Sequence, residues 1–92
     1  MPEIVTVLRW PDGLVQRVYS PSLVVTDHVI AGESYPVADL AERLDRALVE
    51  AGERVRAAYG FPCSRAAASR AAVAQRAAAA GDGMVLVEGF ER

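Results

Sequence analysis

Apolar residues alternate with other residues along the first part of the chain and predict a β-hairpin. Ile4–Trp10 and Leu14–Tyr19 are rich in β-branched and aromatic residues, which favour strands. The segment Pro11-Asp12-Gly13 between them is typical of a turn, because proline fixes φ, aspartate caps the turn and glycine accepts a positive φ. One face of the first strand carries Ile4, Thr6, Leu8 and Trp10. We expect that face to pack on helices, and the other, also partly apolar, to be covered by the next segment or by a partner chain.

From residue 36 onward the apolar positions recur every three or four residues, which predicts a long helix. Pro36 suits its first turn. The predicted apolar stripe consists of Val37, Leu40, Ala41, Leu44, Leu48, Ala51, Val55 and Tyr59. The opposite face carries acid-first pairs four residues apart, namely Asp39/Arg43, Glu42/Arg46 and Glu50/Arg54. The helix is expected to end at Gly60 in a left-handed conformation, because Pro62 cannot continue it.

A second helix is predicted from Ser64 to about Ala80, where alanine gives high helix propensity but little burial energy. Met84–Phe90 reads as a final strand, and residues 20–35 are expected to contain a short strand or a helical turn. The prediction is therefore one α+β domain over residues 1–92. It has a hairpin, a short irregular or strand element, two antiparallel helices and a C-terminal strand that joins a three- to four-stranded, mainly antiparallel sheet with the helices on one face.

Composition narrows the class of protein and its compartment. Apolar content of 52% and charged content of 24% are ordinary for a soluble domain. No apolar run approaches the roughly 20 residues that span a bilayer, and the first residues lack signal-peptide features, so we expect a cytoplasmic protein without membrane contact. A net charge of −2 gives no electrostatic case for nucleic acid. Because a chain this short buries a modest core, a homodimer is expected.

Cys63 is the best candidate nucleophile. The start of the second helix and the nearby Arg65 would both favour the thiolate and lower the pKa of the thiol. The alternative, which we favour, is structural: Cys63 and Ser64 cap the helix, or the thiol packs in the corner between the helices. A base would also be needed, and His28 is the single histidine. One cysteine excludes an internal disulfide and Cys-x-x-Cys metal sites, and we expect neither metal nor cofactor.

The candidate binding residues are hydroxyl, aromatic and basic side chains, namely Trp10, Arg17, Tyr19, Ser20, Ser22, Ser64 and Arg65. The hydroxyl groups before and after Pro21 could bind an anion together with Arg17 or Arg65, or they could form local bonds that terminate the strand. Trp10 could stack on a ligand or belong to the core or an interface. The arginines of the second helix could line one side of it and receive an acidic partner, or form a solvated face.

Three strings resemble a known family: WPDG at 10–13, YSPSLVV at 19–25 and ERVRAAYGFPCSRA at 53–66. They are similar to the small nitrogen-starvation-response proteins of bacteria, which are encoded beside a nitrilase, a radical SAM protein and an acetyltransferase-like protein. The resemblance implies a role in nitrile or cyanide nitrogen assimilation and an enzyme partner from that gene cluster, without a known molecular activity. His28 stands where the resemblance implies an aromatic residue, so it is not expected to be a required catalytic group.

The leading hypothesis is a non-catalytic accessory or binding protein of such a nitrogen-assimilation system, acting through protein or small-ligand contacts. The first alternative is a small enzyme or carrier that uses Cys63. The second, a nucleic-acid-binding regulator, is disfavoured by the net charge of −2.

Overall fold

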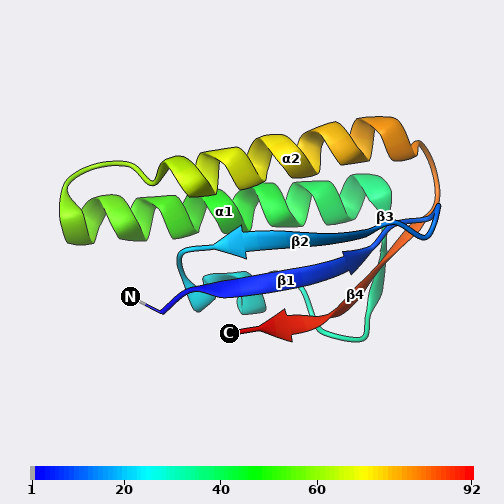
Figure 1. Cartoon of the computed structure of the whole chain (residues 1–92), viewed down its shortest axis with the longest axis horizontal. Coiled ribbons are helices and arrows are strands. Elements are labelled where there is room, and N and C mark those ends of the chain that lie inside the picture. Colours follow the sequence, from blue (N-terminus) through cyan, green and yellow to red (C-terminus); the bar gives the residue numbers. More distant parts are fainter. Residues whose placement is uncertain (1) are drawn as a thin grey trace.

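The computed structural model describes residues 2–92 and has two layers, a four-stranded sheet and two long helices that cover one of its faces (Figure 1). The strands are β1 (Ile4–Arg9), β2 (Val15–Ser20), β3 (Ser34–Pro36) and β4 (Met84–Glu91). The helices are η1, a short 3₁₀ helix (Leu23–Asp27), α1 (Val37–Tyr59) and α2 (Ser64–Ala80). The predicted α+β fold is confirmed.

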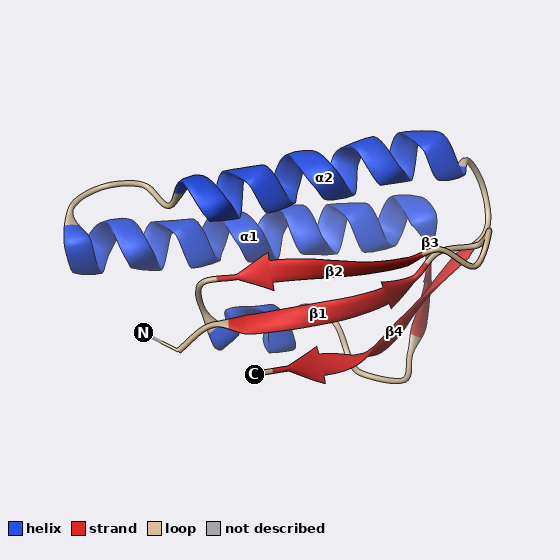
Figure 2. Ribbon diagram, viewed as in Figure 1, coloured by secondary structure: helices blue, strands red, loops and turns tan. Residues whose placement is uncertain are grey.

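The sheet is antiparallel throughout and its strands lie in the order β2-β1-β4-β3 (Figure 2). The predicted hairpin of β1 and β2 is present, and the C-terminal strand joins the sheet between β1 and β3. The helical turn expected within residues 20–35 is η1. The sequence analysis did not place β3, because a strand of three residues is too short to show alternation.

The turn between β1 and β2 has the predicted chemistry. The Asp12 carboxylate accepts a hydrogen bond of 3.1 Å from the backbone N–H of Leu14. Gly13 has a φ of +88° and donates its backbone N–H to the Trp10 carbonyl oxygen at 2.8 Å. A side chain other than glycine would be strained at that φ, so the turn fixes the register of the hairpin.

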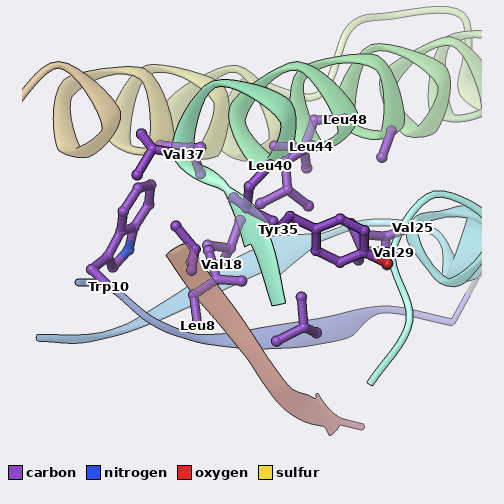
Figure 3. Packing of buried hydrophobic residues seen from close by; sticks show 14 of the residues in the cluster. Leu8, Trp10, Val18, Val25, Val29, Tyr35, Val37, Leu40, Leu44 and Leu48 are labelled. Carbon is purple, nitrogen blue, oxygen red and sulfur yellow. The ribbon is translucent and has the colours of Figure 1, made fainter. Parts of the chain in front are cut away.

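The core lies between the sheet and α1, and Figure 3 shows Leu8, Trp10 and Val18 of the hairpin directed at this helix. The predicted inward face of β1 is buried, from Ile4 to Trp10 at alternate positions. The predicted stripe of α1 is also buried over most of its length, with Ala47 in addition. Tyr59 departs from the prediction, because it lies in the last turn of α1, beyond most of the core, and is 54% exposed.

The two helices meet at the predicted corner. Gly60 has a φ of +82°, and its backbone N–H donates to the carbonyl oxygen of Arg56 at 2.8 Å, which ends α1. All three predicted ion pairs on the outer face of α1 are present, namely Asp39–Arg43, Glu42–Arg46 and Glu50–Arg54. In α2, in contrast, Ala66 and Val73 are the residues that become fully buried.

The arginines of α2 do not line one side of the helix as a row for an acidic partner. Arg65 pairs with Glu3 near the N-terminus, Arg70 with Asp45 on α1, and Arg76 with Asp12 in the hairpin turn. Each arginine therefore fastens α2 to a different part of the chain. In each pair at least one side chain is more than half exposed, so each contact contributes little to stability.

The face of the sheet opposite the two long helices carries the half-buried Val5 and Val7. Ion pairs cross this face, between Arg9 and Glu88 at 3.3 Å and between Arg17 and Glu91 at 2.9 Å. The segment after β2 packs against α1 on the helical side instead of covering this face, contrary to one of the two expectations for it. Within residues 2–92, none of the helices combines the length and apolar character needed to cross a bilayer.

Candidate functional site

A hollow of about 280 Å³ opens at the outer edge of β2, beside the first half of α2. Its lining consists of Gln16, Arg17, Val18, Tyr19, Arg65, Ala68, Ser69 and Ala72. We call it the edge groove. It brings together three of the residues that the sequence analysis proposed for binding, Arg17, Tyr19 and Arg65, although the last of these is distant from the others along the chain.

At one end of the edge groove, the guanidinium carbon of Arg65 lies 3.7 Å from the centroid of the Tyr19 ring. The same guanidinium lies 3.8 Å from a carboxylate oxygen of Glu3. Burial raises the pKa of the Tyr19 hydroxyl, and the Arg65 charge partly opposes that rise. The phenol therefore remains a neutral hydrogen-bond donor at this end of the groove.

Arg17, which lines the edge groove, pairs with Glu91. Its Nε donates to one carboxylate oxygen at 2.9 Å and its Nη2 to the other at 3.1 Å, a bidentate pair. Hydrogen bonding to Arg17 lowers the pKa of the Glu91 carboxyl group. Because both side chains are more than half exposed, the pair contributes little to stability, and an incoming carboxylate could replace Glu91 at small cost.

Ser20 and Ser22 lie outside the edge groove. Both are buried, and the Ser20 hydroxyl donates to the Ser22 carbonyl oxygen at 2.7 Å and accepts from the Ser22 N–H at 3.3 Å. The Ser22 hydroxyl accepts from the N–H of Val24 at 3.3 Å and so caps η1. These contacts match the strand-terminating interpretation of the segment instead of the anion-binding one.

Trp10 is also outside the edge groove and is 1% exposed. Its indole N–H donates to the side-chain oxygen of Gln16 at 2.8 Å, which satisfies the buried donor. Because it belongs to the core cluster and is almost completely buried, Trp10 is a packing residue and has no face open for stacking on a ligand.

Cys63 is the residue directly before α2, and its side chain makes no hydrogen bond that caps the helix. Cys63 is half-buried, so it is not a fully buried corner residue, and without that hydrogen bond it is not a side-chain cap. It lines a hollow of about 180 Å³ between α1 and α2, together with Arg56 and Gly52. Ser64 follows it as the exposed first residue of α2.

His28 is engaged elsewhere. Its Nε2 lies 2.8 Å from a carboxylate oxygen of Glu50, and its backbone carbonyl oxygen accepts from Arg43 at 3.0 Å. It lines a different hollow from the one beside Cys63, so these contacts do not pair the histidine with the thiol. Among the described residues 2–92, no three His, Cys, Asp or Glu side chains gather as a metal site would require.

The sequence analysis missed one further feature, an exposed aromatic pair at the corner between α1 and α2. The rings of Tyr59 and Phe61 lie with centroids 6.4 Å apart, and the side chains are 54% and 62% exposed. Figure 1 shows that this corner extends past the end of the sheet. A signal was available for Phe61, because a residue that follows a helix-ending glycine has left the apolar stripe, whereas the spacing placed Tyr59 within that stripe.

The comparison with protein families gave one match that covers nearly the whole chain. The model of the family NitG, described as nitrogen starvation-induced protein NitG, matches residues 5–90. Neither the curated proteins nor the solved structures gave a match.

Proposed function

Because this chain belongs to the NitG family of nitrogen starvation-induced proteins, we propose that it is a non-catalytic accessory protein that binds an enzyme of bacterial nitrogen assimilation. The enzyme is one that releases nitrogen from nitriles or cyanide, and the nitrilase of the same gene cluster is the first candidate. The protein would meet this enzyme in the cytoplasm.

The observation that carries the proposal is the aromatic pair at the helical corner. Tyr59 and Phe61 are large apolar side chains that remain more than half exposed, and Pro62 beside them is exposed too. Aromatic side chains are enriched among the residues that contribute most to protein–protein binding. The backbone hydrogen bond from Gly60 to Arg56 and the fixed φ of Pro62 restrain the corner, so less conformational entropy would be lost on binding.

Charged residues lie near this apolar tip along the chain. Glu53, Arg54 and Arg56 occupy the last turns of α1, and Arg65 lies just beyond the corner on α2. An apolar centre with a polar rim is the usual anatomy of a protein interface. This arrangement supports contact with a protein surface more than enclosure of a small molecule.

A binding measurement between the purified protein and the nitrilase tests the proposal. We expect saturable binding, which Phe61→Ala weakens at least tenfold. Ile30→Ala is the matched control, because Ile30 is also 62% exposed but lies in the loop after η1. Absence of binding, or equal losses in the two variants, would contradict the proposal.

The competing class is a small enzyme or carrier that uses Cys63. In its favour, the thiol is partly exposed and borders a hollow that contains Arg56. A titration of the rate of thiol alkylation against pH separates the two classes. Rapid reaction near neutral pH would favour chemistry at Cys63, whereas slow reaction with the pKa of a free cysteine supports the accessory role.

A further inference from the structure

The edge groove differs in charge from the chain as a whole. The protein has 12 acidic and 10 basic residues, and its net charge is −2. Within residues 2–92, in contrast, the side chains that line the groove include Arg17 and Arg65 but no aspartate or glutamate. Val18, Ala68 and Ala72 form an apolar wall beside them. A hollow with two cations and an apolar wall is complementary to an anion that carries an apolar group.

The uncharged polar side chains of the edge groove are hydrogen-bond donors. The side-chain oxygen of Gln16 already accepts the indole N–H of Trp10 at 2.8 Å, so the amide retains its NH2 group as a donor. Burial raises the pKa of Tyr19, so its hydroxyl stays protonated. Ser69 adds a second hydroxyl, one helical turn after Arg65. Donors from two elements therefore favour a ligand rich in acceptor oxygens.

Arg65 lies in an orientation that leaves its own donors accessible. Its guanidinium carbon is 3.7 Å from the centroid of the Tyr19 ring, so the planar group lies against the face of the ring. The five N–H donors of a guanidinium lie in its plane, and contact through the face leaves them at its edge. Arg17, in contrast, already donates to both carboxylate oxygens of Glu91. Arg65 is therefore the anchor that an anion would reach first.

Glu3 marks the place of an anion beside this anchor. A carboxylate oxygen of Glu3 lies 3.8 Å from Nη1 of Arg65, which is longer than a hydrogen bond. The same carboxylate contributes to the raised pKa of the Tyr19 hydroxyl. Both Glu3 and Arg65 are more than 60% exposed, and pairs of this kind contribute little to stability. A carboxylate from solution can therefore take the place of Glu3.

We propose that the edge groove binds a small organic carboxylate, held by Arg65 and the Tyr19 hydroxyl, with its apolar chain along Ala68 and Ala72. A carboxylate matches the guanidinium edge with two parallel hydrogen bonds. The volume of about 280 Å³ suits a small molecule. Inorganic phosphate presents similar oxygens but would leave the apolar wall uncovered. The proposal does not depend on which enzyme the protein binds.

An equilibrium titration with three anions tests the ligand class. Butyrate, acetate and inorganic phosphate are added to the full chain, and binding is measured from the chemical-shift changes of the backbone amides that border the groove. We expect saturable binding of butyrate, at least about threefold tighter than that of acetate, because its additional methylene groups contact the apolar wall. Absence of butyrate binding, or equal affinity for the three anions, would overturn the proposal.

Two charge variants should change butyrate binding in opposite directions. Arg65→Gln should weaken it by about tenfold, because the charged anchor is lost. Glu3→Gln should strengthen it by about twofold, because the competing carboxylate is removed. Arg70→Gln is the matched control, since Arg70 is also on α2 but pairs with Asp45 and does not line the groove. Equal losses in the two arginine variants, or weaker binding in Glu3→Gln, would contradict the proposed anchor.

A variant that fills the edge groove tests the apolar wall separately from the charge. Ala72→Leu should remove the preference for butyrate over acetate, because the larger side chain occupies the space along α2. Ala74→Leu should keep the preference, because Ala74 is equally exposed but borders α1. Both alanines are on the surface of α2, so circular dichroism should show unchanged folds. A preference that survives in Ala72→Leu would overturn the placement of the apolar chain.

Discussion

The guanidinium of Arg65 lies 3.7 Å from the centre of the Tyr19 ring and joins the start of α2 to the end of β2. Contacts of this kind at exposed sites contribute about 0.5–1 kcal/mol. They matter more for α2 than for an average helix, because Ala66 and Val73 supply its fully buried surface. The position of α2 over the sheet therefore depends on polar side-chain contacts such as that between Arg65 and Tyr19.

The Arg65–Tyr19 contact predicts a change in the ionisation of the phenol. Burial raises the pKa of Tyr19 and the Arg65 charge opposes the rise, so Arg65→Gln should raise that pKa further. A phenolate absorbance titration measures the shift, with Tyr19→Phe to identify its contribution. Arg70→Gln is the control, because Arg70 pairs with Asp45 instead. An unchanged or lower pKa in Arg65→Gln would contradict the contact.

The ion pair between Asp12 and Arg76 predicts part of the acid sensitivity of the fold. Hydrogen bonding to Arg76 lowers the pKa of the Asp12 carboxyl group below its value in the unfolded chain. The stabilisation is therefore fully present above about pH 4, and it is lost as the pH falls through the lower, folded value. In urea unfolding, the free energy of unfolding should fall less below about pH 4 for Asp12→Asn than for the unmodified protein. Arg76→Gln should show the same reduced loss, and a full acid loss in both variants would exclude this pair as a cause.

Two glycines with open surroundings should respond to substitution in opposite directions. Gly60 has a φ of +82°, so Gly60→Val should cost about 1–2 kcal/mol through backbone strain alone, since nothing lies within 4 Å of the added Cβ. Gly52 is in the middle of α1 with equally open space, so Gly52→Ala should stabilise the protein by about 1 kcal/mol. Thermal unfolding measures both. An unchanged unfolding midpoint in Gly60→Val would contradict the left-handed helix stop at this residue.

Thr6 carries a buried hydroxyl without a hydrogen-bond partner among the residues that the structure describes. The side chain is fully buried, so Thr6→Val should leave the packing intact and raise the free energy of unfolding by up to about 1 kcal/mol. Thr6→Ser is the complementary variant, because it keeps the hydroxyl and loses a methyl group, at a cost of about 0.8 kcal/mol. If valine destabilises as much as serine, the hydroxyl has a partner in solution.

Cys63 should tolerate substitution without loss of the fold. Because its side chain caps nothing, Cys63→Val should change the free energy of unfolding by less than about 0.5 kcal/mol, and its extended backbone, with φ −88° and ψ +109°, suits a β-branched residue. Cys63→Ser should match or exceed the unmodified protein, since serine can form the missing cap. Nitrilase binding by both variants should be unchanged. A serine variant that folds but no longer supports growth on the relevant nitrogen source would point to chemistry at Cys63.

Signals within single segments of the sequence were sufficient to predict most of the fold. Apolar spacing over α1, the chemistry of Pro11-Asp12-Gly13 and the stop at Gly60 are local signals, and the structure confirms each of them. β3 was missed because its pairing with β4 is tertiary: Tyr35 lies opposite Val85, far along the chain. A three-residue strand forms because a neighbouring strand provides hydrogen-bond partners. The sequence of the short strand itself does not indicate that neighbour.

The candidate site was predicted less well, for the same physical reason. Arg17, Tyr19 and Arg65 were proposed from their chemistry, but their common groove depends on α2 crossing the edge of β2. Trp10 was open to two interpretations until its burial and its bond to Gln16 were known. The position of a side chain in layers packed from distant segments cannot be read from spacing within one segment.

The place of β4 in the sheet has a consequence for the order in which the protein acquires its structure. β4 consists of residues 84–91, yet it lies inside the sheet, with β1 on one side and β3 on the other. While the ribosome is still making these residues, β1 and β3 have no common neighbour, and the hairpin and α1 can form only as isolated pieces. The sheet closes after synthesis of β4, through contacts between the two ends of the chain, which folding theory associates with slow rates. Exposed strand edges in that interval are a point at which a chaperone, or a second nascent copy, would first encounter this protein.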